Sequence, residues 1–91
     1  MGQKGGTMIK ILVLSVGISK EKKNPYITFR VWNEQYQSWT TEKRDDGYHD
    51  FLMMVEKDDY DYIKENLSAG LVLDCETRQV GMRVIPSKLI Y

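Results

Sequence analysis

One helix-type segment, set among stretches that favour extended chain, is the feature that most constrains the fold of these 91 residues. The segment lies within residues 57–70, where Tyr60, Ile63 and Leu67 fall on a single narrow apolar stripe of a helix. The segments on both sides are rich in β-branched and aromatic residues, which favour strands. The chain is therefore expected to be mainly β, with a single short helix.

The ends of that segment carry helix-terminus signals. Asp58 or Asp59 is expected to accept hydrogen bonds from the free amides of the first turn, where negative charge also suits the helix dipole. Gly70 is placed to end the helix in a left-handed conformation. The next strand would follow directly after this glycine.

Five strand-type segments surround the helix, three before it and two after it. The first, MIKILVLSVGIS, carries Lys10 as its only charge, and Gly17 is expected to permit a bend or a bulge. Pro25 and the charged run before it separate this strand from the second. The polar stretch 33–47 is expected to extend the second strand into a long hairpin arm. The remaining strands are predicted over 48–56, 71–78 and 81–91.

The second strand, NPYITFRVWNE, divides its side chains between two faces with a period of two. The face expected to be buried carries Ile27, Phe29 and Val31. The face that should meet water carries Tyr26, Thr28, Arg30 and Trp32. Aromatic and arginine side chains on an outward face indicate either a packing partner or a ligand surface.

The third predicted strand has apolar groups on both faces. One face would hold His49, Phe51, Met53 and Val55, and the other Tyr48, Asp50, Leu52 and Met54. This weak alternation favours a strand that is buried on one side and partly covered, or functionally apolar, on the other. In the fourth strand, the buried face is expected to hold Leu71, Leu73 and Cys75.

The order of elements, three strands, a helix and two strands, is that of the OB-fold, a small Greek-key barrel whose helix closes one end. We therefore expect an all-β, five-stranded OB-fold barrel with one short helix between strands three and four. Residues 8–91 would form this single domain, preceded by a flexible, glycine-rich leader over residues 1–7. In this fold, strands two and three form the ligand face, together with the loops joining strands one to two and four to five.

Charge is balanced overall but unevenly placed. The chain carries 13 basic and 13 acidic side chains, and residues 45–65 hold eight of the acidic ones but two of the basic ones. The remainder is moderately basic, which suits a nucleic-acid partner, although the zero net charge argues against a histone-like duplex binder. The single Cys75, with no secretory signal and no long apolar run, predicts a cytoplasmic protein without a membrane span.

Aromatic and basic residues gather where the OB-fold binds its ligand. Aromatic rings stack on bases for about 1–3 kcal/mol each, and lysine and arginine contact the phosphate backbone. The candidate contacts from strand two and its arm are Tyr26, Arg30, Trp32, Tyr36, Trp39, Lys43 and Arg44. The loops are expected to add Lys20, Lys22, Lys23 and Arg78. These residues predict single-stranded DNA binding with little sequence preference, and with no cofactor, metal or small-molecule substrate.

Other interpretations of the same residues stay open. Trp32 and Trp39 would equally fill a subunit interface, so a module that binds protein through the same aromatic face is the alternative function, and RNA is a third ligand. The run KEKK at residues 20–23 is by itself typical of a solvated turn. An enzyme is not expected, because His49 and Cys75 are interpreted as structural groups and no nucleophile, phosphate-loop or zinc motif is present.

The stretch YHDFLMMVEKDDYDYIKENLSAGLVLDCETR resembles the third strand, helix and fourth strand of the bacterial and phage single-stranded DNA-binding protein family. The matching positions are Tyr48, His49, Met54, Leu67, Gly70, Thr77 and Arg78. ITFRVWNEQYQSW is similar to the second strand and arm of that family, and the likeness covers about Ile9 to Tyr91. The chain departs from the family at the start of the first strand, after Arg78 and beyond Tyr91, where the family carries an Asn-Lys-Val start, an aromatic residue and a long acidic-tipped tail.

The resemblance implies base stacking by Tyr48 and by Tyr36 or Trp39, an apolar contact from Met54, and a subunit interface near His49. It also implies a homodimer or homotetramer that serves DNA replication or recombination in a phage, plasmid or other mobile element. The compact filamentous-phage binder, a dimeric OB barrel, is a second comparison. The expected partner is single-stranded DNA.

Overall fold

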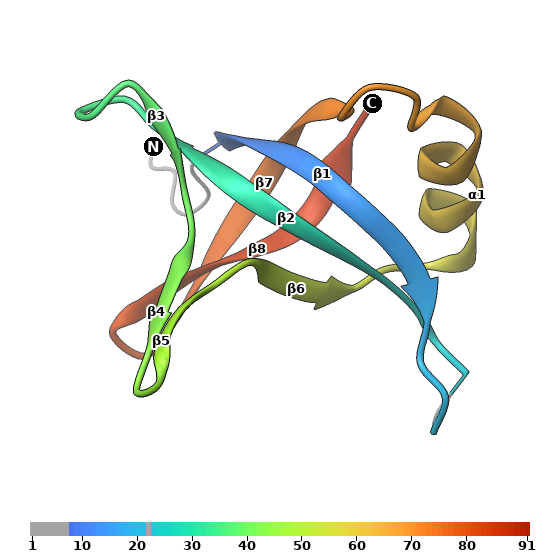
Figure 1. The fold of residues 1–91 in the computed structure, drawn as a ribbon, viewed down its shortest axis with the longest axis horizontal. Coiled ribbons are helices and arrows are strands. Elements are labelled where there is room, and N and C mark those ends of the chain that lie inside the picture. Colours follow the sequence, from blue (N-terminus) through green and yellow to red (C-terminus); the bar gives the residue numbers. More distant parts are fainter. Residues whose placement is uncertain (1–7, 22) are drawn as a thin grey trace.

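The computed structural model describes residues 8–21 and 23–91, which form a mainly β structure (Figure 1). The strands are β1 (Met8–Ile18), β2 (Pro25–Asn33), β3 (Ser38–Thr40), β4 (Glu42–Arg44), β5 (Gly47–His49), β6 (Phe51–Met54), β7 (Val72–Val80) and β8 (Arg83–Ile90). One helix, α1 (Lys57–Asn66), lies between β6 and β7 in the chain. The expected mainly β class with one short helix is therefore confirmed for these residues.

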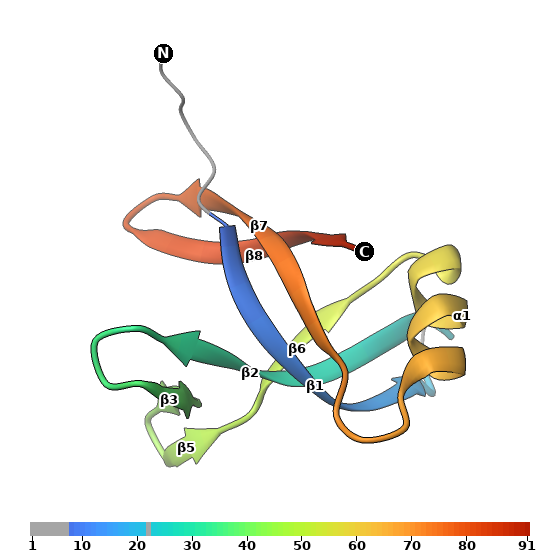
Figure 2. The same ribbon diagram turned by 90° about the horizontal axis from the view of Figure 1, so that it is seen from above.

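Antiparallel pairing joins the strands into a sheet of order β3-β2-β1-β7-β8. β6 also pairs with β2, along residues 26–29, while β3 pairs with residues 31–33 of the same strand. β4 and β5 form a separate hairpin. Figure 2 shows β7 and β8 lying across the core from β2 and β6.

The sheet is not closed as a barrel, because β6 and β8 do not pair among the described residues. The closed five-stranded barrel expected from the sequence is therefore not observed. β6 has only four residues, and β8 contains Pro86, which lacks a backbone donor and lies where the register with β7 shifts. Both features limit pairing along this seam.

The core lies between the two halves of the sheet. Its fully or almost fully buried hydrophobic members are Ile11, Val13, Ile27, Phe29, Ile63, Leu73, Cys75 and Leu89. They come from β1, β2, α1, β7 and β8, so burial of apolar surface joins segments far apart in the sequence. The Phe29 ring also stacks on Phe51 of β6, with centroids 5.5 Å apart. The predicted inward faces of the second and fourth strands are confirmed, except that Val31 and Leu71 are only partly buried.

β1 is irregular at a different place from the one expected. Its register with β2 shifts between Val13 and Ser15, so the bulge lies at Leu14. Gly17, where a bend or bulge was expected, stays paired with Tyr26. A Cβ atom at Gly17 would lie 2.8 Å from the tip of the Tyr26 ring. This glycine therefore makes room for a cross-strand aromatic ring.

The predicted hairpin arm and third strand are each divided. Only β3 continues from β2, after a turn over residues 34–37, and the rest of the arm pairs as β4 with β5. The expected single third strand is interrupted at Asp50, so that β5 pairs with β4 and β6 pairs with β2. The segment predicted as one strand therefore forms two strands, each paired with a different neighbour.

The helix forms as predicted, but its termini differ. Its N-cap is Glu56, which makes no side-chain capping hydrogen bond, while Asp58 and Asp59 lie in the first turn. It ends at Asn66, and Gly70 takes a left-handed conformation (φ +84°) further along the connection. Within residues 8–21 and 23–91, no helix combines the length and apolar character needed to cross a membrane.

Candidate ligand-binding face

The outward side of β2, together with its neighbours β3 and β6, forms one continuous surface. Pairing places Met54 beside Tyr26 and Leu52 beside Thr28, and Trp39 of β3 lies opposite Trp32. Strand alternation predicts these partners on the same side of the sheet, opposite the buried Ile27 and Phe29. We call this surface the β2 outer face, and its members are Tyr26, Thr28, Arg30, Trp32, Trp39, Leu52 and Met54.

The two tryptophans of the β2 outer face contact each other. Their ring centroids lie 5.2 Å apart with an interplanar angle of 66°, an edge-to-face arrangement. Both side chains are partly exposed, so this contact does not remove them from solvent. Aromatic pairs of this kind contribute about 0.5–1.5 kcal/mol beyond their burial. The pair orients the two rings relative to each other near the C-terminal end of β2.

Arg30 lies between the tryptophan pair and Tyr26 along β2, and it is paired with an acidic side chain. Its Nε donates to Asp50 Oδ1 at 2.9 Å. The two side chains are 44% and 37% exposed, which places the pair in contact with solvent. An exposed ion pair is worth about 0–1 kcal/mol, so Arg30 is oriented without being strongly held.

Tyr26 marks the other end of the β2 outer face. Its ring lies over Gly17 of β1, and Met54 beside it is 51% exposed. Next along the strand, the hydroxyl groups of Thr28 and Ser15 are hydrogen-bonded across β1 and β2. Tyr26 and Met54 thus make a mixed aromatic and apolar surface near the β1–β2 loop.

The predicted arm residues lie at two separate places. Tyr36 is 69% exposed in the turn between β2 and β3, where its backbone N–H donates to Asn33 Oδ1 at 3.0 Å. Tyr48 is 70% exposed on β5, with Lys43 Nζ of β4 at 5.9 Å from the centre of its ring. Arg44 donates to Glu42 Oε1 at 2.9 Å, so its positive charge is partly neutralised within the β4–β5 hairpin.

The predicted basic loop residues are not all brought to the β2 outer face. Lys20 and Lys23 are exposed in the β1–β2 loop, close in the chain to Tyr26, and Lys23 has a left-handed backbone (φ 56°). Lys22 lies outside the described residues. Arg78 is exposed on β7, which β1 separates from β2 in the sheet. The structure therefore leaves Arg78 apart from the face, and it places Lys23 in a pocket with Pro25 of β2 and with Lys57, Tyr60 and Asp61 of α1.

Sequence reasoning missed one member of this surface, Leu52, and one neighbour of it, Asp50. Leu52 is 51% exposed beside Thr28, and Asp50 is the partner of Arg30. The alternation of the third predicted strand does place both on its outward side. Their relation to Arg30 and Thr28 depends on the register between β2 and β6, which the sequence does not encode locally.

The single histidine and the single cysteine have separate surroundings. His49 Nε2 lies 2.7 Å from Asp46 Oδ1 in the β4–β5 hairpin. Cys75 is fully buried in the core, and burial raises the pKa of its thiol. Among the residues that the structure describes, no group of three or more His, Cys, Asp and Glu side chains is arranged to hold a metal ion.

Comparisons with protein-family models, curated proteins and solved structures found no significant match. The chemistry of the β2 outer face is therefore assessed from its own side chains. It offers two indole rings, a phenol ring, one guanidinium group and two exposed apolar side chains. These groups can stack on flat rings and hydrogen-bond an anion, and they include no nucleophile with an adjacent base.

Proposed function

We propose that this protein is an OB-type module that binds single-stranded DNA on the β2 outer face. The observation that carries the proposal is the continuous row of partly exposed Tyr26, Arg30 and Trp32, extended sideways by Trp39 and Met54. A strand with an apolar inner side needs none of these groups for its core. Their position beside one another supports a surface for flat, charged ligands.

The mechanism is stacking combined with phosphate neutralisation. Alternate residues along a strand lie about 6.6 Å apart, so Tyr26, Arg30 and Trp32 offer successive contacts to an extended polynucleotide. Arg30 supplies a guanidinium group for a phosphate or a base plane, and Lys20 and Lys23 extend the basic character at the β1–β2 end. No bond is made or broken. The site would show little sequence preference, because every base has a flat face.

The proposal extends to the setting in which such a protein works. The protein would act as a homodimer or homotetramer in the replication or recombination of mobile DNA. We place it in the cytoplasm. RNA remains a third ligand, since no group of the β2 outer face is identified that reads a 2′-hydroxyl.

Protein binding on the same face is the second candidate function. It is favoured by the edge-to-face pair of Trp32 and Trp39 and by exposed Leu52 and Met54, because interfaces are enriched in aromatic residues and methionine. The Arg30–Asp50 pair also presents both signs of charge, which suits a protein surface better than a polyanion.

Tryptophan fluorescence separates the two functions, because Trp32 and Trp39 both belong to the proposed face. A thymidine oligonucleotide is titrated into the protein at low and at moderate salt, with a uridine oligonucleotide in parallel. Stacking should quench the fluorescence, and the affinity should fall as salt rises. Unchanged fluorescence with both oligonucleotides, together with no gel shift at micromolar protein, would exclude the nucleic-acid function and favour the protein-binding module.

A further inference from the structure

The open seam between β6 and β8 leaves two strand edges that can pair with another strand. Among the described residues, β6 pairs only with β2 and β8 pairs only with β7. Each strand therefore presents one row of backbone N–H and C=O groups toward the seam. Such edges are templates for another strand, and proteins usually cover or interrupt them. A peptide that inserts here would pair with both edges at once, except at Pro86 of β8, which has no N–H group to donate.

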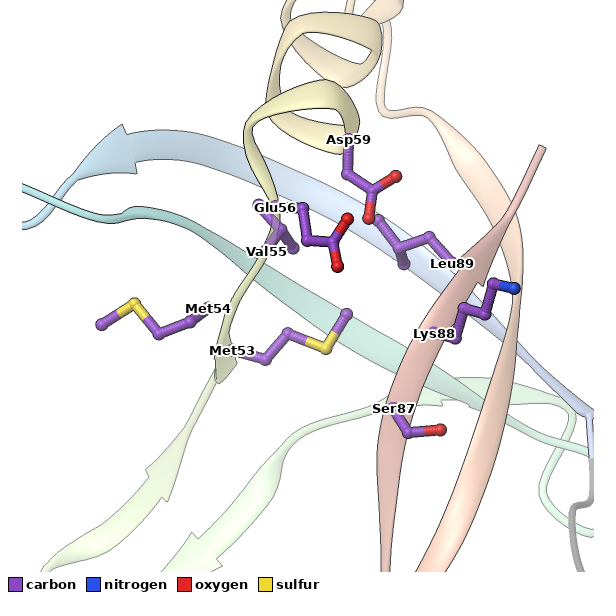
Figure 3. A pocket seen from close by; sticks show the side chains of 8 residues that line it. All are labelled: Met53, Met54, Val55, Glu56, Asp59, Ser87, Lys88 and Leu89. Atoms are coloured by element: carbon purple, nitrogen blue, oxygen red, sulfur yellow. The ribbon is translucent and has the colours of Figure 1, made fainter.

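Two pockets lie along this seam, one on each side of Met53, which lines both. The first, about 390 Å³, is bounded by Met53, Val55 and Leu89 and by the side chains of Glu56 and Asp59 (Figure 3). The second, about 210 Å³, is mostly apolar and is lined by Phe29, Glu42, Phe51, Leu52, Met53, Val84, Ile85 and Pro86. Side chains at alternate positions of an extended peptide would enter the two pockets.

The charge around the first pocket indicates which kind of side chain would bind there. The carboxylates of Glu56 and Asp59 point into the space between β6 and β8, whereas the Lys88 amino group points away from it (Figure 3). Asp59 Oδ1 accepts a hydrogen bond from the Tyr91 hydroxyl at 2.7 Å, and Glu56 forms no ion pair among the described residues. The pocket thus combines an apolar floor with an acidic rim, which fits a lysine or arginine side chain.

The strand directions fix the orientation of a bound peptide. β6, β2, β1, β7 and β8 are joined by successive antiparallel pairings, so β6 and β8 run in the same sense. An inserted strand can therefore be antiparallel to both, which is the more stable pairing. The first pocket lies at the end of β6 that leads into α1, and the second lies at its start. A peptide antiparallel to β6 would therefore enter at the first pocket, with its basic residue two positions before its apolar residue.

We propose that the β6–β8 seam binds an extended segment of a partner protein with the pattern Lys or Arg, any residue, large apolar residue, by strand addition antiparallel to both β6 and β8. The basic side chain lies beside Glu56 and Asp59, and the apolar side chain fills the pocket beside Phe51 and Ile85. The backbone of the segment closes the sheet. This proposal concerns a protein ligand and does not rest on nucleic-acid binding by the β2 outer face.

The test uses the protein labelled with nitrogen-15 and a peptide of sequence Thr-Lys-Thr-Phe-Thr with acetylated and amidated ends. Amide resonances of β6 and β8 should shift on titration, and their hydrogen exchange should slow. The reversed peptide, Thr-Phe-Thr-Lys-Thr, and a peptide with glutamate in place of lysine should bind at least tenfold more weakly. A peptide carrying N-methyl groups on its backbone should not bind, because strand addition needs its N–H donors.

A matched pair of variants tests the acidic rim. Glu56→Gln should weaken the lysine peptide about three- to tenfold, and Glu65→Gln, an equal charge change on the exposed part of α1, should leave it unchanged. The proposal is overturned if no β6 or β8 resonance shifts at millimolar peptide, or if the forward, reversed and glutamate peptides bind alike. It is also overturned if the seam resonances change with protein concentration alone, since the occupant would then be a second copy of the chain.

Discussion

Arg30 and Asp50 form an ion pair on the β2 outer face, with Nε and Oδ1 2.9 Å apart. Asp50 directly precedes β6, and one further step of the β2–β6 register beyond the Phe29–Phe51 pair places its carboxylate opposite Arg30. The cation best positioned for a phosphate thus already has a competing acceptor. Any phosphate that Arg30 binds must displace or share Asp50.

Replacing Asp50 by asparagine tests that competition. Asp50→Asn should raise the affinity for a thymidine oligonucleotide about three- to tenfold, because Arg30 is freed and a repulsive charge is removed. The unfolding free energy should fall by no more than about 1 kcal/mol, as expected for an exposed pair. Fluorescence titration and urea unfolding measure the two effects.

The control for this variant is Asp58→Asn, which removes the same charge from the first turn of α1. An equal gain in affinity from both substitutions would show that only net charge matters and that Arg30 has no special role. An unchanged affinity in Asp50→Asn would remove Arg30 from the proposed contact surface.

Trp32 should contribute to DNA binding by stacking on a base. Trp32→Ala is expected to weaken oligonucleotide binding by about 1–3 kcal/mol, the usual value of one stacked base. The variant also loses the edge contact with Trp39, which contributes about 0.5–1.5 kcal/mol to the unfolding free energy beyond the burial of the rings. Met82→Ala, at a side chain 97% exposed beyond β7, serves as the control and should change neither quantity. Equal affinities for Trp32→Ala and the wild type would argue against stacking at this position.

The two faces of β2 were predictable from the sequence, and the partners of its outer side chains were not. Burial of Ile27 and Phe29 follows from a local period of two, which any half-buried strand shows. The contacts of Tyr26 with Gly17 and of Arg30 with Asp50 depend on pairing with β1 and β6, which are distant in the sequence. Local patterns therefore identify the face but not its neighbours.

Irregularities of the sheet were also beyond local reasoning. The bulge of β1 lies at Leu14, within a run of aliphatic residues that carries no turn signal, and not at Gly17. The extra residue lets the buried Val13 and the partly buried Val16, on either side of it, both pack against the core. Pro86 of β8, by contrast, is a local signal of an edge strand, because proline has no backbone donor.

Phe29 should be the side chain of β2 on which folding depends most. It is 1% exposed and stacks on Phe51, so Phe29→Ala is expected to cost about 3–5 kcal/mol. Thr28→Ala, one residue away on the outer side, should cost only about 0.5–1.5 kcal/mol through the lost Ser15 hydrogen bond. Urea unfolding followed by circular dichroism measures both. Comparable losses in the two variants would contradict the assignment of the inner face.

The pKa of Tyr91 should lie well above that of an ordinary tyrosine. Its hydroxyl donates to Asp59 Oδ1 at 2.7 Å, and this hydrogen bond raises the pKa from 10.0 to about 12. Since the folded pKa lies above the ordinary value, this contact contributes stability below about pH 10 and loses it as the pH rises through about 12. Absorbance titration of the phenolate, compared with Tyr91→Phe, isolates this group from the other tyrosines. In Asp59→Asn the pKa should return toward 10, because the carboxylate acceptor is gone. A Tyr91 pKa that is ordinary in the wild type, or unchanged in Asp59→Asn, would contradict the hydrogen bond that joins the chain end after β8 to α1.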